Sequence, residues 1–158
     1  MPTRPPARKS ALTIPCQKLV PWAHLPERKS AGAAGYDLTL AADCTIPNTN
    51  VQQEAVIAHT GIALAIPCGY HGKIFLRSSQ GLKTKVRLAN GTGIIDSDYR
   101  GEICLLLENN ARQTIHLAKG ERIAQLLIEP NTDLAIIDAE TLPSTERGTK
   151  GFGSTGKD

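Results

Sequence analysis

Short apolar runs separated by turn-forming residues make up most of the chain after residue 26. GIALAIP at 61–67 alternates between apolar and small positions, as in a strand with one buried face, whereas KIFL at 73–76 and EICLLLEN at 102–109 are continuous apolar runs typical of buried strands. TIHLAKGERIAQLLIEP at 114–130 predicts two strands that turn at Lys119-Gly120, and LAIID at 134–138 follows. Short strands at intervals of about 8–12 residues predict an all-β fold.

One helix and one tight turn interrupt this pattern. Ser78 and Ser79 are good N-cap residues and 80–85 tolerates a helix, which predicts about two helical turns. Asn90-Gly91 lies between two apolar runs and is the dipeptide that a two-residue type I′ turn prefers. The sequence therefore predicts a β-hairpin with its tip at Asn90-Gly91.

The two ends of the chain differ from this body. Six of the ten prolines fall within the first 26 residues, so we expect 1–26 to be an extended, flexible arm and 27–142 to be the folded domain. The segment 143–158 contains RGTKGFGSTG, with four of the fourteen glycines. Such an end is either a loose terminus or a lid that orders over a ligand, with Phe152 stacking on a flat group.

Composition and charge exclude several classes of protein. A chain of 158 residues with 41% hydrophobic and 21% charged residues fits one soluble domain. No apolar run approaches the roughly 18 residues of a membrane span, and the start of the chain lacks the apolar stretch of a signal peptide, so we expect a cytoplasmic or nuclear protein. A net charge of +3 and six scattered aromatic residues do not predict a nucleic-acid-binding face.

Cysteine and histidine spacing gives no sign of a metal cluster. No C-x-x-C pair and no helical H-x-x-x-H pair occurs, which favours reduced, mostly buried thiols and surface histidines. The residues concerned are Cys16, Cys44, Cys68, Cys104, His24, His59, His71 and His116.

Two segments and two carboxylates could together act on a phosphate ester. Arg77 with the two following serines has the form of an anion site, and Arg147 offers a second contact for phosphate. Asp37 and Asp96 could hold a hydrated metal ion and a water nucleophile, because Mg²⁺ keeps several of its waters and binds through substrate phosphates. Taken alone, the acidic and aromatic residues after the predicted hairpin could equally form a solvated edge.

Five segments together resemble a known family. AGAAGYDL, RSS, NGTGIIDSDYRGE, GERIAQLL and RGTKGFGSTG occur in the order and approximate spacing of the five motifs of the trimeric dUTPases, from Ala31 to Gly156. The resemblance implies a jelly-roll-like β-barrel that forms a homotrimer. It also implies active sites between subunits. One chain would supply the first, second and fourth motifs, a second chain the third motif, and a third chain the tail.

The implied reaction is the Mg²⁺-dependent hydrolysis of dUTP to dUMP and pyrophosphate, by attack of water on the α-phosphorus, which also supplies dUMP for thymidylate synthesis. Asp96 matches the carboxylate that orients and deprotonates water, Asp37 and Gln125 match residues that hold water and hydrated metal, and Tyr99 matches the ring against deoxyribose. Substrate contacts are implied for Arg77, Ser78, Ser79, Asn90, Gly93, Ile95, Asp96, Tyr99, Arg147, Phe152, Gly153, Ser154 and Thr155.

One position departs from the family pattern. The second motif of the family usually reads Arg-Ser-Gly, and here Ser79 stands in place of the glycine, which restricts close backbone approach to phosphate.

Two alternative functions share the same fold. A dCTP deaminase would not need the complete GIIDSDYRGE and RGTKGFGSTG segments. A regulatory or binding protein that has lost catalysis would be marked by loss of Asp96, Tyr99 or the tail, all of which are present.

Overall fold

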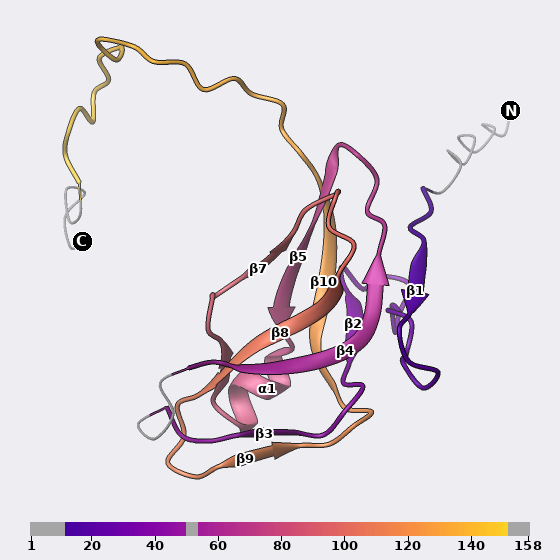
Figure 1. The fold of residues 1–158 in the computed structure, drawn as a ribbon. Helices are drawn as coiled ribbons and strands as arrows, with labels where there is room; N and C mark the ends of the chain where they lie inside the picture. Colours follow the sequence, from indigo (N-terminus) through magenta and orange to yellow (C-terminus); the bar gives the residue numbers. More distant parts are fainter. Residues whose placement is uncertain (1–11, 50–53, 152–158) are drawn as a thin grey trace, which may run out of the picture.

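A computed structural model of the chain describes residues 12–49 and 54–151. Within these ranges the chain forms antiparallel strands and one short helix (Figure 1). In chain order they are β1 (Cys16–Lys18), β2 (Tyr36–Thr39), β3 (Cys44–Ile46), β4 (Val56–Leu64), β5 (Tyr70–Leu76), α1 (Ser78–Lys83), β6 (Val86–Leu88), β7 (Gly93–Ile95), β8 (Glu102–Asn109), β9 (Ile115–Leu117) and β10 (Arg122–Pro130). The predicted all-β class with a single short helix is confirmed.

The strands form three sheets. Two have four strands, in the orders β1-β4-β8-β6 and β2-β10-β5-β7, and β3 pairs with β9 in a third. Apolar side chains from these sheets share one core, in which Ile103, Leu107 and Ile123 are fully buried. In the described ranges the pairings form separate sheets and do not close into one ring.

The run EICLLLEN is buried on one side only. Ile103, Leu105 and Leu107 face the core, whereas Cys104 is half-buried and Leu106 is 38% exposed. The expected buried strand is therefore confirmed for the face of β8 that points to the core, whereas the other face is only partly covered by the described residues. Alternate side chains of a strand point to opposite faces, so one continuous apolar run can line both a core and a surface.

Residues 12–26 pack against the body, although we expected them in the extended arm. β1 pairs with β4, with Cys16 opposite Leu64. Ala23 is buried, and the Trp22 indole N–H donates to the Ala41 carbonyl at 2.9 Å. Ala23 thereby belongs to the core, and Ile14, Cys16 and Val20 pack against it. The domain boundaries 1–26, 27–142 and 143–158 stay predictions.

The helix is confirmed, but its start differs from the expectation. Arg77 takes the N-cap position with extended backbone, and no side-chain hydrogen bond caps the helix there. Ser78 is instead the first helical residue. Within the described residues, no helix is long and apolar enough to cross a membrane.

The predicted hairpin at Asn90-Gly91 is wrong. β6 pairs with β8 and β7 pairs with β5, so the strands on either side of the turn belong to different sheets. Gly91 has φ of 69°, but Asn90 is not among the described residues with positive φ, which a type I′ turn would require. The turn closes through a hydrogen bond from the Gly91 N–H to the Leu88 carbonyl at 2.9 Å and carries the chain from one sheet to the other.

The predicted strand LAIID is also wrong within this chain. After β10 the chain leaves the body (Figure 1), and its described residues 131–151 are exposed and form no strand. Ile136 is fully exposed, and Leu134 and Ile137 are more than three-quarters exposed. The apolar character of this segment therefore has no partner in the described part of the same chain.

Gly61 is required where β4 bends, and its replacement tests this. Its φ is +68°, and an added Cβ would lie 2.8 Å from Val20 Cγ2 and 2.9 Å from the Ala41 Cβ. We expect Gly61→Ala to lower the free energy of unfolding by the backbone strain of about 1–3 kcal/mol and by a similar amount for overpacking. Gly69→Ala is the matched control, because Gly69 has φ of +82° with nothing within 4 Å. Equal losses in urea unfolding would contradict the steric part of this prediction.

Candidate active site

Asp37 lies between two guanidinium groups at the point where β2, β5 and β10 meet. Strand pairing places Gln125 of β10 directly opposite Asp37 of β2. The Arg122 Nη1 donates to Asp37 Oδ2 at 2.8 Å, and Arg77 Nε lies 3.4 Å from Asp37 Oδ1. Because the Asp37 side chain is only 15% exposed, these two arginines compensate a largely buried charge. Asp37 thereby fixes the guanidinium of Arg77, which also donates to the Arg122 carbonyl at 3.1 Å.

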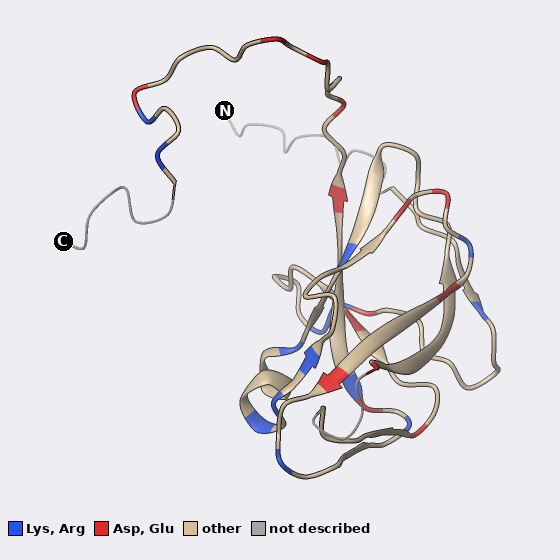
Figure 2. Cartoon of the chain, turned by 60° about the vertical axis from the view of Figure 1, so that its left-hand side comes forward, with Lys and Arg blue, Asp and Glu red and all other residues tan. Residues whose placement is uncertain are grey.

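A positively charged pocket of about 500 Å³ opens beside this ion-pair cluster. Arg77, Lys83 and Arg122 line it together with His116, against one acidic residue, Glu121. Several Lys and Arg positions lie around α1 at this end of the fold (Figure 2). Guanidinium groups bind phosphate oxygens in two-pronged geometry, so the pocket suits a polyanion.

The second-motif serines differ in position. Ser79 lines the positively charged pocket, and Ser78 does not. Arg122 was not selected from the sequence, although it lies in GERIAQLL three residues before Gln125. The signal that could have found it is strand register, because Arg122 begins β10 opposite Thr39, close to Asp37 on β2.

A second pocket, of about 280 Å³, gathers the predicted third-motif residues. Asn90, Gly93, Ile95, Asp96 and Tyr99 all line it. β7 is the last strand of its sheet, so one edge of its backbone is not paired within the described part of the chain. A free strand edge offers alternating N–H donors and carbonyl acceptors to a planar ligand.

Asp96 and Tyr99 present different groups to this pocket. The Asp96 side chain is exposed, and its carboxylate has no hydrogen-bond or ion-pair partner within 12–49 and 54–151. Tyr99 is anchored, because its hydroxyl donates to the Glu102 carbonyl at 3.0 Å, and a side chain at Gly101 would overlap its ring. The pocket thus combines a carboxylate that has no partner in the described residues with an anchored aromatic ring.

Glu102 and Cys104, which also line the second pocket, were not selected from the sequence. Burial raises the pKa of Glu102, but hydrogen bonds from His59 and the Gly61 N–H outweigh it and hold this pKa below its usual value. Burial, together with the charge of Glu102, raises the pKa of Cys104 to about 11. The Cys104 thiol in this setting is not an activated nucleophile.

The two pockets share no lining residue within one chain. Arg77, Asp37 and Ser79 belong to one end of the fold, and Asp96 and Tyr99 line the other pocket.

The predicted site residues of the C-terminal segment line neither of the two pockets and lie outside the core where they are described. Arg147 is exposed, and its Nε donates to the Lys150 carbonyl at 3.1 Å. Phe152, Gly153, Ser154 and Thr155 lie outside the described residues.

Comparison with known proteins bears on the family and the fold of the chain. The dUTPase family model matches residues 22–156. The deoxyuridine 5'-triphosphate nucleotidohydrolase of Methylocella silvestris is 44% identical over 132 residues, which are 84% of this chain and 82% of the relative.

Among solved structures, the dUTPase of Staphylococcus bacteriophage 80alpha with dUPNHPP matches with a TM-score of 0.83 at 30% identity, over 93% of this chain and all of that one. A mutant dUTPase from phage phi11 of S. aureus, described with a structural Mg(II) ion, matches with a TM-score of 0.73 at 28% identity, over 82% of this chain and 98% of that one. With its family model, close relative and fold in agreement, the chain belongs to the dUTPase family.

Proposed function

We propose that this protein hydrolyses dUTP to dUMP and pyrophosphate, with water attacking the α-phosphorus. The observation that carries the proposal is the second pocket, where a carboxylate without a protein partner lies beside a fixed aromatic ring and a free strand edge. The free edge of β7 and the Asn90 amide would recognise the pairing edge of uracil. Cytosine reverses the donor and acceptor pattern of that edge, which would leave groups unpaired at a cost of about 1–3 kcal/mol each.

In this mechanism Asp96 orients the attacking water and accepts its proton. A carboxylate is a weak base at neutral pH, so positioning and charge compensation would provide most of the rate. Arg77 and Arg122 would bind the triphosphate oxygens in the positively charged pocket.

The residues present fit a hydrated Mg²⁺ ion held by the substrate and do not fit a cage of protein ligands. Both oxygens of the Asp37 carboxylate already face guanidinium groups, and the described residues contain no cluster of three carboxylates suited to a hard cation. Asp37 and the neighbouring Gln125 would therefore reach the ion through its waters. When bound, Mg²⁺ would neutralise charge on the triphosphate oxygens.

We also propose that the complete site forms between subunits of a homotrimer. The positively charged pocket and the second pocket share no residue in one chain, so a second copy would bring them together. The exposed apolar segment 134–142 likewise lacks a partner in the described chain and would pack against a neighbouring copy.

The activity is tested with purified protein, Mg²⁺ and each of dUTP, dCTP, dTTP, dATP and UTP, by following pyrophosphate release. We expect release from dUTP alone, and loss of that release when a chelator removes Mg²⁺. Release of ammonia from dCTP would instead identify a deaminase. Equal release from all nucleotides, or none from dUTP, would refute the proposal.

Mixing two inactive variants tests the shared site. Asp96→Asn and Arg77→Ala remove groups that we assign to different subunits of one site. If equimolar chains are unfolded together and refolded, about one quarter of the sites should contain both intact groups by random assembly of a cyclic trimer. Each variant refolded alone is the control. If the mixture remains as inactive as its components, the two groups act within one chain or the trimer does not form.

Tyr99→Ala is expected to weaken discrimination against UTP. Removing the anchored ring opens space for a 2′-hydroxyl, so the ratio of kcat/KM for dUTP to that for UTP should fall by about tenfold or more. Tyr99→Phe is the matched control, because it keeps the ring and removes only the hydrogen bond to the Glu102 carbonyl. An unchanged ratio in Tyr99→Ala would mean that the sugar is selected elsewhere.

A further inference from the structure

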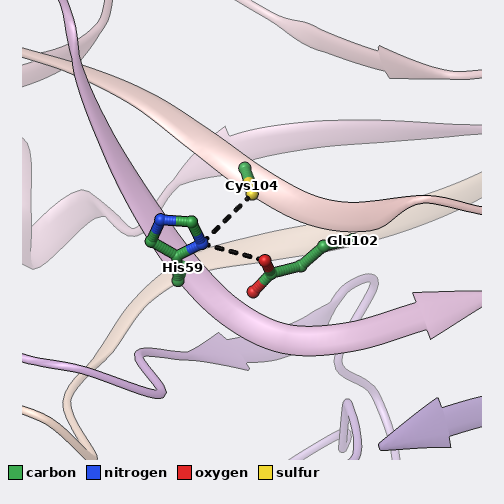
Figure 3. A group of neighbouring side chains, drawn as sticks. All are labelled: His59, Glu102 and Cys104. Atoms are coloured by element: carbon green, nitrogen blue, oxygen red, sulfur yellow. Dashed lines mark hydrogen bonds and ion pairs between the residues drawn. The ribbon is translucent and has the colours of Figure 1, made fainter. Parts of the chain in front are cut away.

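His59, Glu102 and Cys104 meet on the outer face of β4 and β8, although 43 or more residues separate His59 from the other two. Strand pairing places His59 directly opposite Cys104. The His59 Nδ1 lies 2.8 Å from Glu102 Oε2 and 3.7 Å from Cys104 Sγ, so one ring nitrogen faces both other groups (Figure 3). All three potential ligand atoms lie within 4.8 Å of one another.

We propose that these three side chains bind one Zn²⁺ ion. Imidazole nitrogen, thiolate sulfur and carboxylate oxygen are the zinc ligands of proteins, and thiolate with imidazole selects against the hard cation Mg²⁺. The thiolate and carboxylate together balance the charge of Zn²⁺, and the thiol proton leaves to solvent when the ion binds. Water would complete the tetrahedron, since the side chain of His59 is 54% exposed and that of Glu102 is 25% exposed.

The spacing of the ligand atoms suits a tetrahedral ion. Zn–S and Zn–N bond lengths place the sulfur and nitrogen ligands about 3.6 Å apart, and the structure has 3.7 Å between Cys104 Sγ and His59 Nδ1. The nitrogen and oxygen ligands would lie about 3.4 Å apart, so the present 2.8 Å hydrogen bond between His59 and Glu102 must open by about half an ångström. A rotation of the exposed His59 ring can supply this change.

The backbone already holds the carboxylate ligand in place. The pairing register of β4 and β8 shifts between His59 and Ala63, and within this bulge the Gly61 N–H donates to Glu102 Oε1 at 2.7 Å. This bond leaves Oε2 directed at the His59 ring. Metal ligands are characteristically oriented by such a second hydrogen bond. The bulge requires glycine at this position, because a side chain at Gly61 would overlap its neighbours.

The site is distinct from the substrate groups assigned above, and the inference does not rest on the proposed function. Glu102 and Cys104 border the second pocket, but their metal-binding atoms meet at His59, which is not among the residues lining that pocket. An ion here would join β4 to β8 across the bulge. Metal binding can therefore be measured in the absence of nucleotide, and its failure would leave the hydrolysis of dUTP untouched.

Cobalt provides the test, because tetrahedral Co²⁺ with a thiolate ligand gives strong visible bands and a sulfur-to-cobalt charge-transfer band. The full chain is dialysed against a chelator and titrated with Co²⁺ without nucleotide. We expect one equivalent per chain, with a charge-transfer band that Zn²⁺ abolishes and excess Mg²⁺ does not. Absence of the band in the unmodified protein would refute the proposal.

Variants identify the ligands. Cys104→Ser should lose the charge-transfer band and weaken Co²⁺ binding by more than about tenfold, since even outer partners of metal ligands contribute about 10–100-fold. Cys16→Ser and Cys68→Ser are the controls and should keep the band. His59→Asn should keep the thiol yet also bind more than tenfold more weakly, and it provides an independent test if Cys104→Ser does not fold. Retention of the band in Cys104→Ser, its loss in Cys68→Ser, or unchanged affinity in His59→Asn would each contradict the proposal.

Discussion

Replacement of Asp96 by asparagine is expected to lower kcat for dUTP by several orders of magnitude and to leave dUTP binding nearly unchanged. The amide keeps the volume of the carboxylate but cannot accept the proton of the attacking water. Because Asp96 has no side-chain partner in the described chain, its loss breaks no hydrogen bond or ion pair there and the fold should be preserved. The effect should therefore appear in kcat, measured at saturating dUTP, with the affinity for a non-hydrolysable analogue measured separately.

Asp98→Asn is the matched control for this variant. Asp98 is exposed two residues away and is not among the residues lining the second pocket, so its replacement makes the same change in charge without touching the proposed base. We expect its kcat to stay within about twofold, because exposed charges contribute little. If Asp96→Asn keeps more than a tenth of the kcat, which corresponds to a loss under about 1.4 kcal/mol, Asp96 is not the base.

Removal of residues 147–158 is expected to reduce kcat/KM by more than about a hundredfold without unfolding the protein. Of the residues that truncation after Glu146 removes, the described ones, 147–151, are exposed and make no core contact. Arg147 and the glycine-rich backbone would bind the terminal phosphates as an anion nest, and Phe152 would stack on uracil for about 1–3 kcal/mol. Ordering each residue costs about 1–2 kcal/mol, so closure should require the triphosphate contacts.

A shorter truncation controls for loss of the C-terminus itself. Removing only Lys157 and Asp158 leaves RGTKGFGSTG intact and should preserve kcat/KM. Thermal unfolding and sedimentation of both truncated proteins test whether fold and assembly survive. Full activity after truncation at Glu146 would make the segment a loose terminus, which is the alternative that its composition also allows.

Local sequence patterns predicted the parts of the fold that depend on neighbours along the chain. Apolar runs in β4, β5, β8 and β10 indicated strands, because alternating or short continuous apolar residues are the main sequence signal for a β-strand. The helix at Ser78 followed from the same local reasoning. The family resemblance rests on ordered motifs, which also depend only on sequence, and the comparisons confirm the family.

Tertiary structure overruled the sequence where a segment had two possible partners. Asn90-Gly91 favours a tight hairpin, yet β6 pairs with β8 and β7 pairs with β5, so the two flanking strands enter different sheets. LAIID has the composition of a strand but no available edge in the described chain, and it stays exposed. Residues 12–26 pack on the body because β4 offers an edge that the arm's composition could not reveal.

The sequence by itself thus determined the all-β class, the short helix, the family and the motif residues that were taken as candidates. Only the tertiary structure decided which of these residues share a pocket, that Asp37 lies between Arg77 and Arg122, and that His59 meets Cys104. The physical reason is that strand propensity and turn chemistry act over a few residues, whereas register and sheet order depend on burying one shared core. That shared core brings together side chains whose separation along the chain carries no signal.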